Sequence, residues 1–309
     1  MAAAIGVVIT EHIVAGRLQE ENEQMVVVGE HLRFPADPSE TEALIGMPTS
    51  EMYELLAQLI KRLISETPDR GATGSVTAIG VAVPGVVRNG VVQDAPNLAQ
   101  IKGLRFGEAL SAVLREQGVH APVHILNDAD AVAAGLASRG GHLDRLIRVW
   151  TLGNGIGYGR WPIADGVWEG GHTVVTLDPR ERFCGCGGVG HIEGIMGNRA
   201  MRLRFMDMEP EDVFANGKSG DARCSEFVDL WHRALAAGCA TAIHLGGPGR
   251  FYFTGLNIRF LDIKLLREHL DAMVRMSLLQ SYSLEVLPAE DAISILGAGV
   301  AALRAQQEW

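Results

Sequence analysis

The sequence predicts an α/β protein made of two similar halves. Each half opens with a pair of β-branched runs around a short polar turn, at Ile5–Leu18 and again at Arg148–Trp161. In both halves, apolar runs typical of buried strands then alternate with amphipathic segments typical of helices. We therefore expect a duplicated α/β fold whose halves flank a cleft, with strand ends facing a ligand there.

Length and composition agree with this organisation. The chain has 309 residues, which at roughly 150 residues per domain predicts two domains, and 47% of them are apolar. Its 27 Lys and Arg against 37 Asp and Glu give a formal net charge of −10, which argues against a nucleic-acid-binding surface. The sequence holds no run of ~18 apolar residues and no basic N-terminal region, so we expect no membrane span, no secretory signal and a cytoplasmic protein.

In the first half, a polar stretch separates the hairpin from a helix over residues 52–64. The apolar residues of that helix recur at helical spacing after Ser50, which we assign as the N-cap. The continuous apolar run Val76–Val83 predicts a buried strand that a Pro-Gly pair stops. A helix over Phe106–Glu116 is expected to end at Gly118.

The second half continues the alternation. We expect a strand at Val123–Leu126, an Ala-rich helix to Gly140, the second hairpin, a loop at Trp168–Gly197, a helix at Cys224–Leu245, a strand at Phe251–Thr254, a helix at Phe260–Met276, a strand at Ser283–Leu287 and a final helix after Asp291. The smaller N-terminal domain is assigned residues 1–126 and about 291–309, and the larger domain residues 127–290.

The segment Cys184–Glu193 indicates a metal site. Two cysteines one residue apart, a histidine five residues on, and glycines that let the chain turn tightly suit a tetrahedral zinc site. His172 is the nearest upstream candidate for a fourth ligand, and Cys224 and Cys239 are expected to take no part. The alternative is a pair of free cysteines in a glycine-rich turn.

A second candidate is Asn127-Asp128, where a predicted strand runs straight into a helix. A carboxylate at a strand end can act as a general base toward a hydroxyl. The alternative is that Asp128 or Asp130 caps the following helix, and taken alone this is the simpler interpretation.

The third candidate is the turn Gly153-Asn154-Gly155. Backbone N–H groups in such a turn can bind a phosphate. The alternative is a tight type I′ turn without a ligand, which is favoured in the absence of other motifs.

Together these motifs resemble those of the ROK family of sugar kinases and related repressors, in the expected order over nearly the whole chain. The matching stretches are Val81–Gly85 with Ala95–Leu98, Asn127-Asp128, Thr151–Gly157, Glu169-x-Gly171-His172 and Cys184–Glu193. The resemblance implies the duplicated actin/hexokinase-like (ribonuclease H-like) α/β fold with a small zinc-binding loop. It also implies a homodimer with a small-molecule sugar as its ligand.

The resemblance further implies roles for individual residues. The sugar would be held by Asn97, Asn127, Asp128, Glu169, His172 and Glu193, and phosphate by Gly153, Asn154 and Gly155. Asp128 would take the proton from the sugar hydroxyl that attacks ATP, with Mg²⁺ as the cofactor. A structural Zn²⁺ would be bound by His172, Cys184, Cys186 and His191, which leaves no open position for a reacting water.

Two departures from the family pattern are local. His191 stands where the family has a third cysteine, and imidazole is an ordinary zinc ligand, so the site is expected to persist. The glycine run on the adenosine side is reduced to Gly255 within Phe253–Asn257, which is expected to narrow the nucleotide pocket.

The largest departure is in the first phosphate loop. Alignment of the opening hairpin puts Val8 where the family has an Asp that positions magnesium, and Thr10-Glu11-His12 where it has Gly-Gly-Thr. Without those glycines the backbone cannot approach a phosphate closely, and Glu11 would repel it.

The sequence therefore supports two hypotheses. One is a ROK-type kinase that phosphorylates a hexose or amino sugar. The other is a former kinase with intact sugar and zinc sites but impaired ATP binding, acting as a different sugar-transforming enzyme or as a sugar-binding sensor. Because the chain begins at the first strand, we expect no DNA-binding domain.

Overall fold

The computed structural model describes residues 3–37, 39–65, 76–163 and 169–306, and these form two compact units. The first unit draws on Met1–Ile147, Gly159–Val167 and Glu290–Trp309, and the second on Arg148–Tyr158 and Trp168–Ala289. The loop expected to begin at Trp168 lies within the described residues only from Glu169 onward. Among the described helices, none combines the length and apolar character needed to span a bilayer.

The first unit is built on a mixed five-stranded sheet in the order β3-β2-β1-β4-β7. Its strands are β1 (Ala3–Ile9), β2 (Ile13–Glu21), β3 (Gln24–Phe34), β4 (Ala78–Val83) and β7 (Val123–Asn127). Strand β1 pairs antiparallel with β2 and parallel with β4, and β4 pairs parallel with β7. The parallel part agrees with the continuous apolar runs, because such strands are covered on both faces.

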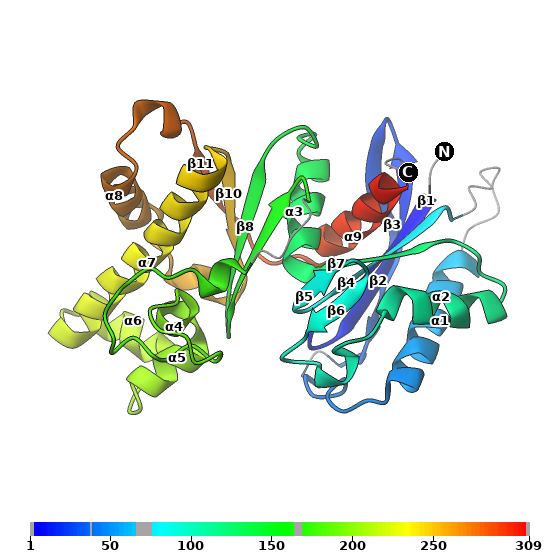
Figure 1. Cartoon of the computed structure of the whole chain (residues 1–309), viewed down its shortest axis with the longest axis horizontal. Helices are drawn as coiled ribbons and strands as arrows, with labels where there is room; N and C mark the ends of the chain where they lie inside the picture. Colours follow the sequence, from blue (N-terminus) through cyan, green and yellow to red (C-terminus); the bar gives the residue numbers. More distant parts are fainter. Residues whose placement is uncertain (1–2, 38, 66–75, 164–168, 307–309) are drawn as a thin grey trace. The chain divides into compact units, whose positions relative to one another are not determined.

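Helices cover both faces of this sheet (Figure 1). Alternate residues of β1 point to opposite faces: Ile5 and Val7 pack with α1 (Thr49–Ser65) and α2 (Phe106–Glu116), whereas Ala4 and Val8 pack with α9 (Asp291–Ala305). Helix α2 has the predicted bounds. Helix α1 already begins at Thr49, so Ser50 lies in its first turn and is not its N-cap.

Helix α3 (Asp128–Arg139) packs against α9, and for this reason it belongs to the first unit. The domain boundary assigned from the sequence after residue 126 differs from this arrangement. It placed α3 in the larger domain and α9, against which α3 packs, in the smaller one. The contact is so close that a Cβ added to Gly297 of α9 would lie 1.7 Å from the carbonyl oxygen of Ala131. Glycine is therefore required where these two helices cross.

Three strands of the first unit were not predicted. The stretch described above as polar contains β3, which has an exposed face and occupies the edge of the sheet. A small hairpin, β5 (Val86–Arg88) with β6 (Val91–Asp94), turns at Asn89-Gly90, where φ is 50° and 70°. The Asn-Gly pair between apolar residues was the signal that could have revealed this hairpin.

The second unit holds most of a four-stranded sheet in the order β11-β10-β8-β9, of which Ile147 and residues 159–161 are assigned to the first unit. Its strands are β8 (Ile147–Leu152), β9 (Ile156–Trp161), β10 (Arg250–Thr254) and β11 (Ser283–Val286), and its helices are α4 (Glu193–Met196), α5 (Asn198–Arg204), α6 (Pro210–Lys218), α7 (Ala222–Gly246) and α8 (Ile263–Met273). Trp231 and Leu235 of α7 lie in one core with Phe251 and Phe253 of β10. Helices α5 and α6 were not predicted, whereas α7 and α8 lie within a few residues of their predicted bounds.

Candidate functional site

The end of β7 presents Asp128 at the first position of α3. The neighbouring Asn127 caps the helix, since its Oδ1 accepts the N–H groups of Ala129 at 2.8 Å and Asp130 at 3.3 Å. The alternative in which Asp128 or Asp130 is the cap is therefore wrong. The carboxylate of Asp128 accepts the N–H of Ala129 at 3.0 Å and lies at the positive end of the helix dipole.

Asn127 also ties this helix start to the turn after β4. Its Nδ2 donates to the carbonyl oxygen of Gly85 at 2.7 Å. Gly85 has φ of 96°, and a Cβ there would lie 2.2 Å from the carbonyl oxygen of Asp94, just before the segment that carries the exposed Asn97. Because β4 and β7 are parallel, these residues gather at one end of the first sheet, and the side chain of Asn127 helps to hold them there.

The second unit brings the predicted metal ligands together. The ligand atoms of His172, Cys184, Cys186 and His191 all lie within 4.8 Å of one another. Sγ of Cys184 is 3.4 Å from Nδ1 of His172 and 3.4 Å from Sγ of Cys186, which is 3.3 Å from Nδ1 of His191. The other two cysteines, Cys224 and Cys239, are buried and lie outside this cluster, as expected.

These four side chains fit a zinc ion. Zn–S bonds of about 2.3 Å and Zn–N bonds of about 2.0 Å at tetrahedral angles separate ligand atoms by roughly 3.3–3.8 Å. The three distances given above, 3.3–3.4 Å, are close to these values. Burial raises the pKa of the Cys184 thiol to about 12; the backbone N–H of Cys186 opposes this rise, while the Cys186 thiol and Glu193 add to it. A cation bound beside the sulfur would favour the thiolate. Nε2 of His172 lies 3.9 Å from Oε2 of Glu169, which places a carboxylate behind that ligand.

A short antiparallel contact between residues 173–175 and 190–192 positions the segment Cys184–Glu193, here called the metal loop. The N–H of Val175 donates to the carbonyl oxygen of Gly190 at 2.8 Å, and the N–H of Ile192 donates to that of Thr173 at 3.0 Å. Gly190 has φ of 74°, and a Cβ there would lie 2.0 Å from the carbonyl oxygen of Thr176. This pairing brings His172 and His191, which are far apart in sequence, to the same loop.

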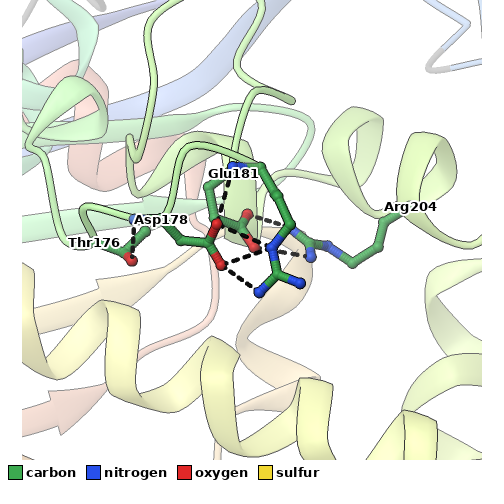
Figure 2. Close-up of polar contacts among 5 residues, drawn as sticks. Thr176, Asp178, Glu181 and Arg204 are labelled. Atoms are coloured by element: carbon green, nitrogen blue, oxygen red, sulfur yellow. Dashed lines mark hydrogen bonds and ion pairs between the residues drawn. The ribbon is translucent and has the colours of Figure 1, made fainter.

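A partly buried ion pair between Arg204 and Glu181 lies near the start of the metal loop. Figure 2 shows Arg204, which extends from α5 to the carboxylate of Glu181, next to Asp178. The guanidinium of Arg204 also stacks on the ring of Phe183, 4.6 Å from its centroid. Since Phe183 directly precedes Cys184, the ion pair fixes the chain where it enters the metal loop. Sequence reasoning did not find Arg204, because its partner lies in a different segment.

Glu193 connects the metal loop to the Gly153–Gly155 turn. One carboxylate oxygen is 3.5 Å from Sγ of Cys184, and the other accepts the N–H of Ile156 at 3.1 Å. The turn itself closes with a hydrogen bond from the N–H of Gly153 to the carbonyl oxygen of Gly155 at 3.1 Å. None of its three residues has positive φ, so the type I′ alternative is wrong.

The β1–β2 turn, aligned above with the first phosphate loop, is occupied by its own contacts. The N–H of Thr10 donates to the carbonyl oxygen of His12 at 2.9 Å, which closes the turn, and Glu11 is exposed. Nε2 of His12 lies 3.9 Å from Oδ1 of Asp291, and Arg33 donates to Oδ2 of Asp291 at 3.2 Å. The nearby His12 and the positive charge of Arg33 lower the pKa of the Asp291 carboxyl, although its partial burial acts in the opposite direction.

Comparison with known proteins agrees with this geometry. The ROK family profile matches residues 37–304 of the chain. The glucokinase of Pyrobaculum calidifontis is 30% identical over 202 residues, which cover 60% of this chain and 64% of that protein. The xylose repressor of Caldicellulosiruptor bescii is 24% identical over 287 residues, which cover 82% of this chain and 68% of the repressor.

The fold comparison extends over the whole chain. The crystal structure of ROK hexokinase from Thermus thermophilus has a TM-score of 0.72 at 21% identity, and the match covers 99% of this chain and 100% of the hexokinase. This similarity confirms the expected actin/hexokinase-like α/β fold. The match of the family profile over most of the sequence shows that the chain belongs to the ROK family.

Proposed function

We propose that this protein is an ATP-dependent sugar kinase that phosphorylates a hexose or amino sugar. The observation that carries the proposal is the position of the Asp128 carboxylate at the N-terminus of α3. The preceding residue, Asn127, caps this helix and is hydrogen-bonded to Gly85. The similarity to the P. calidifontis glucokinase supports it, although the matched segment spans less than two thirds of that protein.

In the proposed reaction, Asp128 accepts the proton of the attacking sugar hydroxyl. The sugar oxygen forms a bond to the γ-phosphorus of ATP while the bond to ADP breaks, so that the products are a sugar phosphate and ADP. Asn127 orients Asp128 through its cap and its bond to Gly85. We extend the proposal to a set of sugar-binding residues, which comprises Asn97, Asn127, Asp128, Glu169, His172 and Glu193.

The test is ADP release from Mg-ATP in the presence of a panel of hexoses and amino sugars, beside a thermal-shift series with the same sugars. We expect ADP release that depends on one class of sugar and a rise in melting temperature with that sugar. A sugar that stabilises the protein without any release of ADP would exclude the kinase and support the sugar-binding alternative.

One observation favours that alternative. The turn from Thr10 to His12 is tied to the start of α9 by Asp291, and Glu11 adds an exposed carboxylate where a polyphosphate would lie. A protein that retains the sugar site and has lost the first phosphate loop would bind a sugar without turning it over. The similarity to the C. bescii xylose repressor is compatible with such a role.

The binding of Mg-ATP is expected to be weak in either case. We predict a dissociation constant in the millimolar range or above, corresponding to about −4 kcal/mol or less favourable, because the first loop offers a carboxylate in place of glycine amides. Glu11→Gly should strengthen binding, and the gain should shrink as salt is added, since the repulsion it removes is screened.

Titration calorimetry at low and high ionic strength measures both effects. Glu42→Gly, which removes an exposed carboxylate from the segment after β3, is the matched control and should leave the affinity unchanged. Micromolar binding of Mg-ATP to the parent protein would contradict the prediction and strengthen the kinase proposal.

We also propose that His172, Cys184, Cys186 and His191 bind one structural zinc ion. Four protein ligands leave no open position, so the ion would order the loop that carries Glu193 and would not activate water. Cys186→Ser should lower the zinc content from about one ion per chain to near zero and reduce the melting temperature, because metal binding and folding of such loops are coupled.

Elemental analysis and calorimetry of the purified variant provide the measurement. Cys224→Ala is the control, since Cys224 lies outside the cluster, and it should retain its zinc. Full zinc retention in Cys186→Ser would show that this ligand set is wrong.

A further inference from the structure

A pair of buried amide side chains lies behind the Gly153–Gly155 turn. Asn257, in the short helix η3 (Leu256–Phe260), is 0% exposed, and Asn198, the first residue of α5, is 6% exposed. Nδ2 of Asn257 donates to Oδ1 of Asn198 at 2.7 Å and to the carbonyl oxygen of Gly153 at 3.2 Å. The backbone N–H of Asn198 donates to the same carbonyl oxygen at 3.1 Å. Three segments distant in sequence therefore meet at one peptide group.

Burial of these two amide side chains costs free energy that the burial of aliphatic side chains would not. Their presence here therefore suggests a role that depends on their hydrogen bonds. An amide removed from water loses solvation that hydrogen bonds only partly replace. Oδ1 of Asn257 is buried and has no hydrogen-bond partner among the described residues. The turn thus keeps a polar anchor at a site where aliphatic side chains would fill the space at less cost.

The geometry of the peptide bond shows what the anchor does. In a trans peptide, the carbonyl of one residue and the N–H of the next lie in one plane and point in opposite directions. Because Asn257 and Asn198 hold the carbonyl of Gly153 toward the interior, the N–H of Asn154 is directed away from it. The N–H groups of Gly153 and Ile156 are already bonded to Gly155 and Glu193.

We propose that Asn257 and Asn198 are positioning residues that present the N–H groups of Asn154 and Gly155, both in exposed residues, to the phosphates of a nucleoside triphosphate. Adjacent outward N–H groups form a concave donor site for an anionic oxygen. This inference rests on the proposed function, because it assigns the binding of ATP phosphates, which the proposed kinase needs, to the Gly153–Gly155 turn. It also gives Asn257 a role at the position where the family's adenosine-side glycine run is interrupted.

The experiment measures tripolyphosphate binding through the NMR signals of the Asn154 and Gly155 amides in the zinc-loaded, isotope-labelled protein. In the parent protein, both amides should shift on titration. Asn257→Leu removes both donors and is expected to weaken binding at least tenfold, or about 1.4 kcal/mol. Asn198→Ala keeps its own backbone bond to Gly153 and should weaken binding less.

Val213→Ala is the matched control, since Val213 is fully buried in the same core but lies on α6, outside the turn. It should lower the melting temperature and leave tripolyphosphate affinity unchanged. If Asn257→Leu does not fold, the graded loss in Asn198→Ala carries the test.

Two results would overturn the inference. Unchanged affinity in the folded Asn257→Leu variant, or in Asn198→Ala where the former fails to fold, would remove the positioning role. The absence of any shift at Asn154 and Gly155 in the parent protein would remove the phosphate site at this turn. Sugar binding and sugar-dependent ADP release are measured separately, so a failure of the proposed kinase activity would be recognised independently.

Discussion

Asp128→Asn is expected to lower kcat for sugar phosphorylation by about 10²- to 10⁴-fold, or roughly 3–5 kcal/mol of transition-state stabilisation. The amide retains an oxygen that can accept the N–H of Ala129, so the start of α3 should remain intact. It cannot accept a proton from the sugar hydroxyl, and for that reason catalysis should fall while sugar affinity stays within about tenfold of the parent value.

Steady-state kinetics with the preferred sugar, together with calorimetric sugar binding, separate these two effects. Asp130→Asn is the matched control on the same helix, because Asp130 accepts the backbone N–H of Arg160 at 2.8 Å and the amide oxygen can do the same. The control should keep nearly full activity. An Asp128→Asn variant as active as the parent would show that Asp128 is not the general base.

Gly297→Ala is expected to destabilise the first unit by about 3 kcal/mol or to prevent its folding. Alanine in a helix interior ordinarily stabilises relative to glycine by up to ~1 kcal/mol, so intrinsic propensity predicts the opposite sign. The added Cβ would lie 1.7 Å from the carbonyl oxygen of Ala131 and 2.5 Å from the N of Gly135, and both are backbone atoms of α3. Relief of that overlap requires α3 and α9 to separate.

Chemical denaturation of the purified variant measures this loss. Ser294→Ala, on the same helix and half-buried, gains helix propensity without adding bulk, and it should change the unfolding free energy by less than about 0.5 kcal/mol. A Gly297→Ala protein as stable as the parent would mean that the two helices do not cross at the distance described.

The same close packing recurs at the sheet. Gly6 and Gly80 are partners in the pairing of β1 with β4, and a Cβ on either would lie 1.9 Å from a carbonyl oxygen of α9. The apolar runs around these glycines predicted two buried strands. The two glycines did not reveal that α9, from the far end of the chain, lies on the sheet at these positions. A glycine in a strand can also mark a bulge, a bend or the close approach of a ligand.

The sequence by itself determined the elements and motifs that depend on near neighbours. The period of apolar residues located β4, α2 and both hairpins, since each period follows from local backbone geometry. Three of the four predicted metal ligands lie within Cys184–His191, so a short glycine-rich loop is enough to bring them together. The resemblance carried by these motifs led to the family and to the fold.

The tertiary structure alone decided the contacts between distant segments. Asp291 meets Arg33 across 258 positions of sequence, and Asn257 meets Asn198 across 59, and neither pair belongs to a local pattern. Asn127, expected to hold the sugar, also caps α3 and anchors the turn at Gly85, because that turn lies within reach of its amide. A polar side chain can bond to solvent, ligand or protein, and only the folded chain determines which partner is near enough.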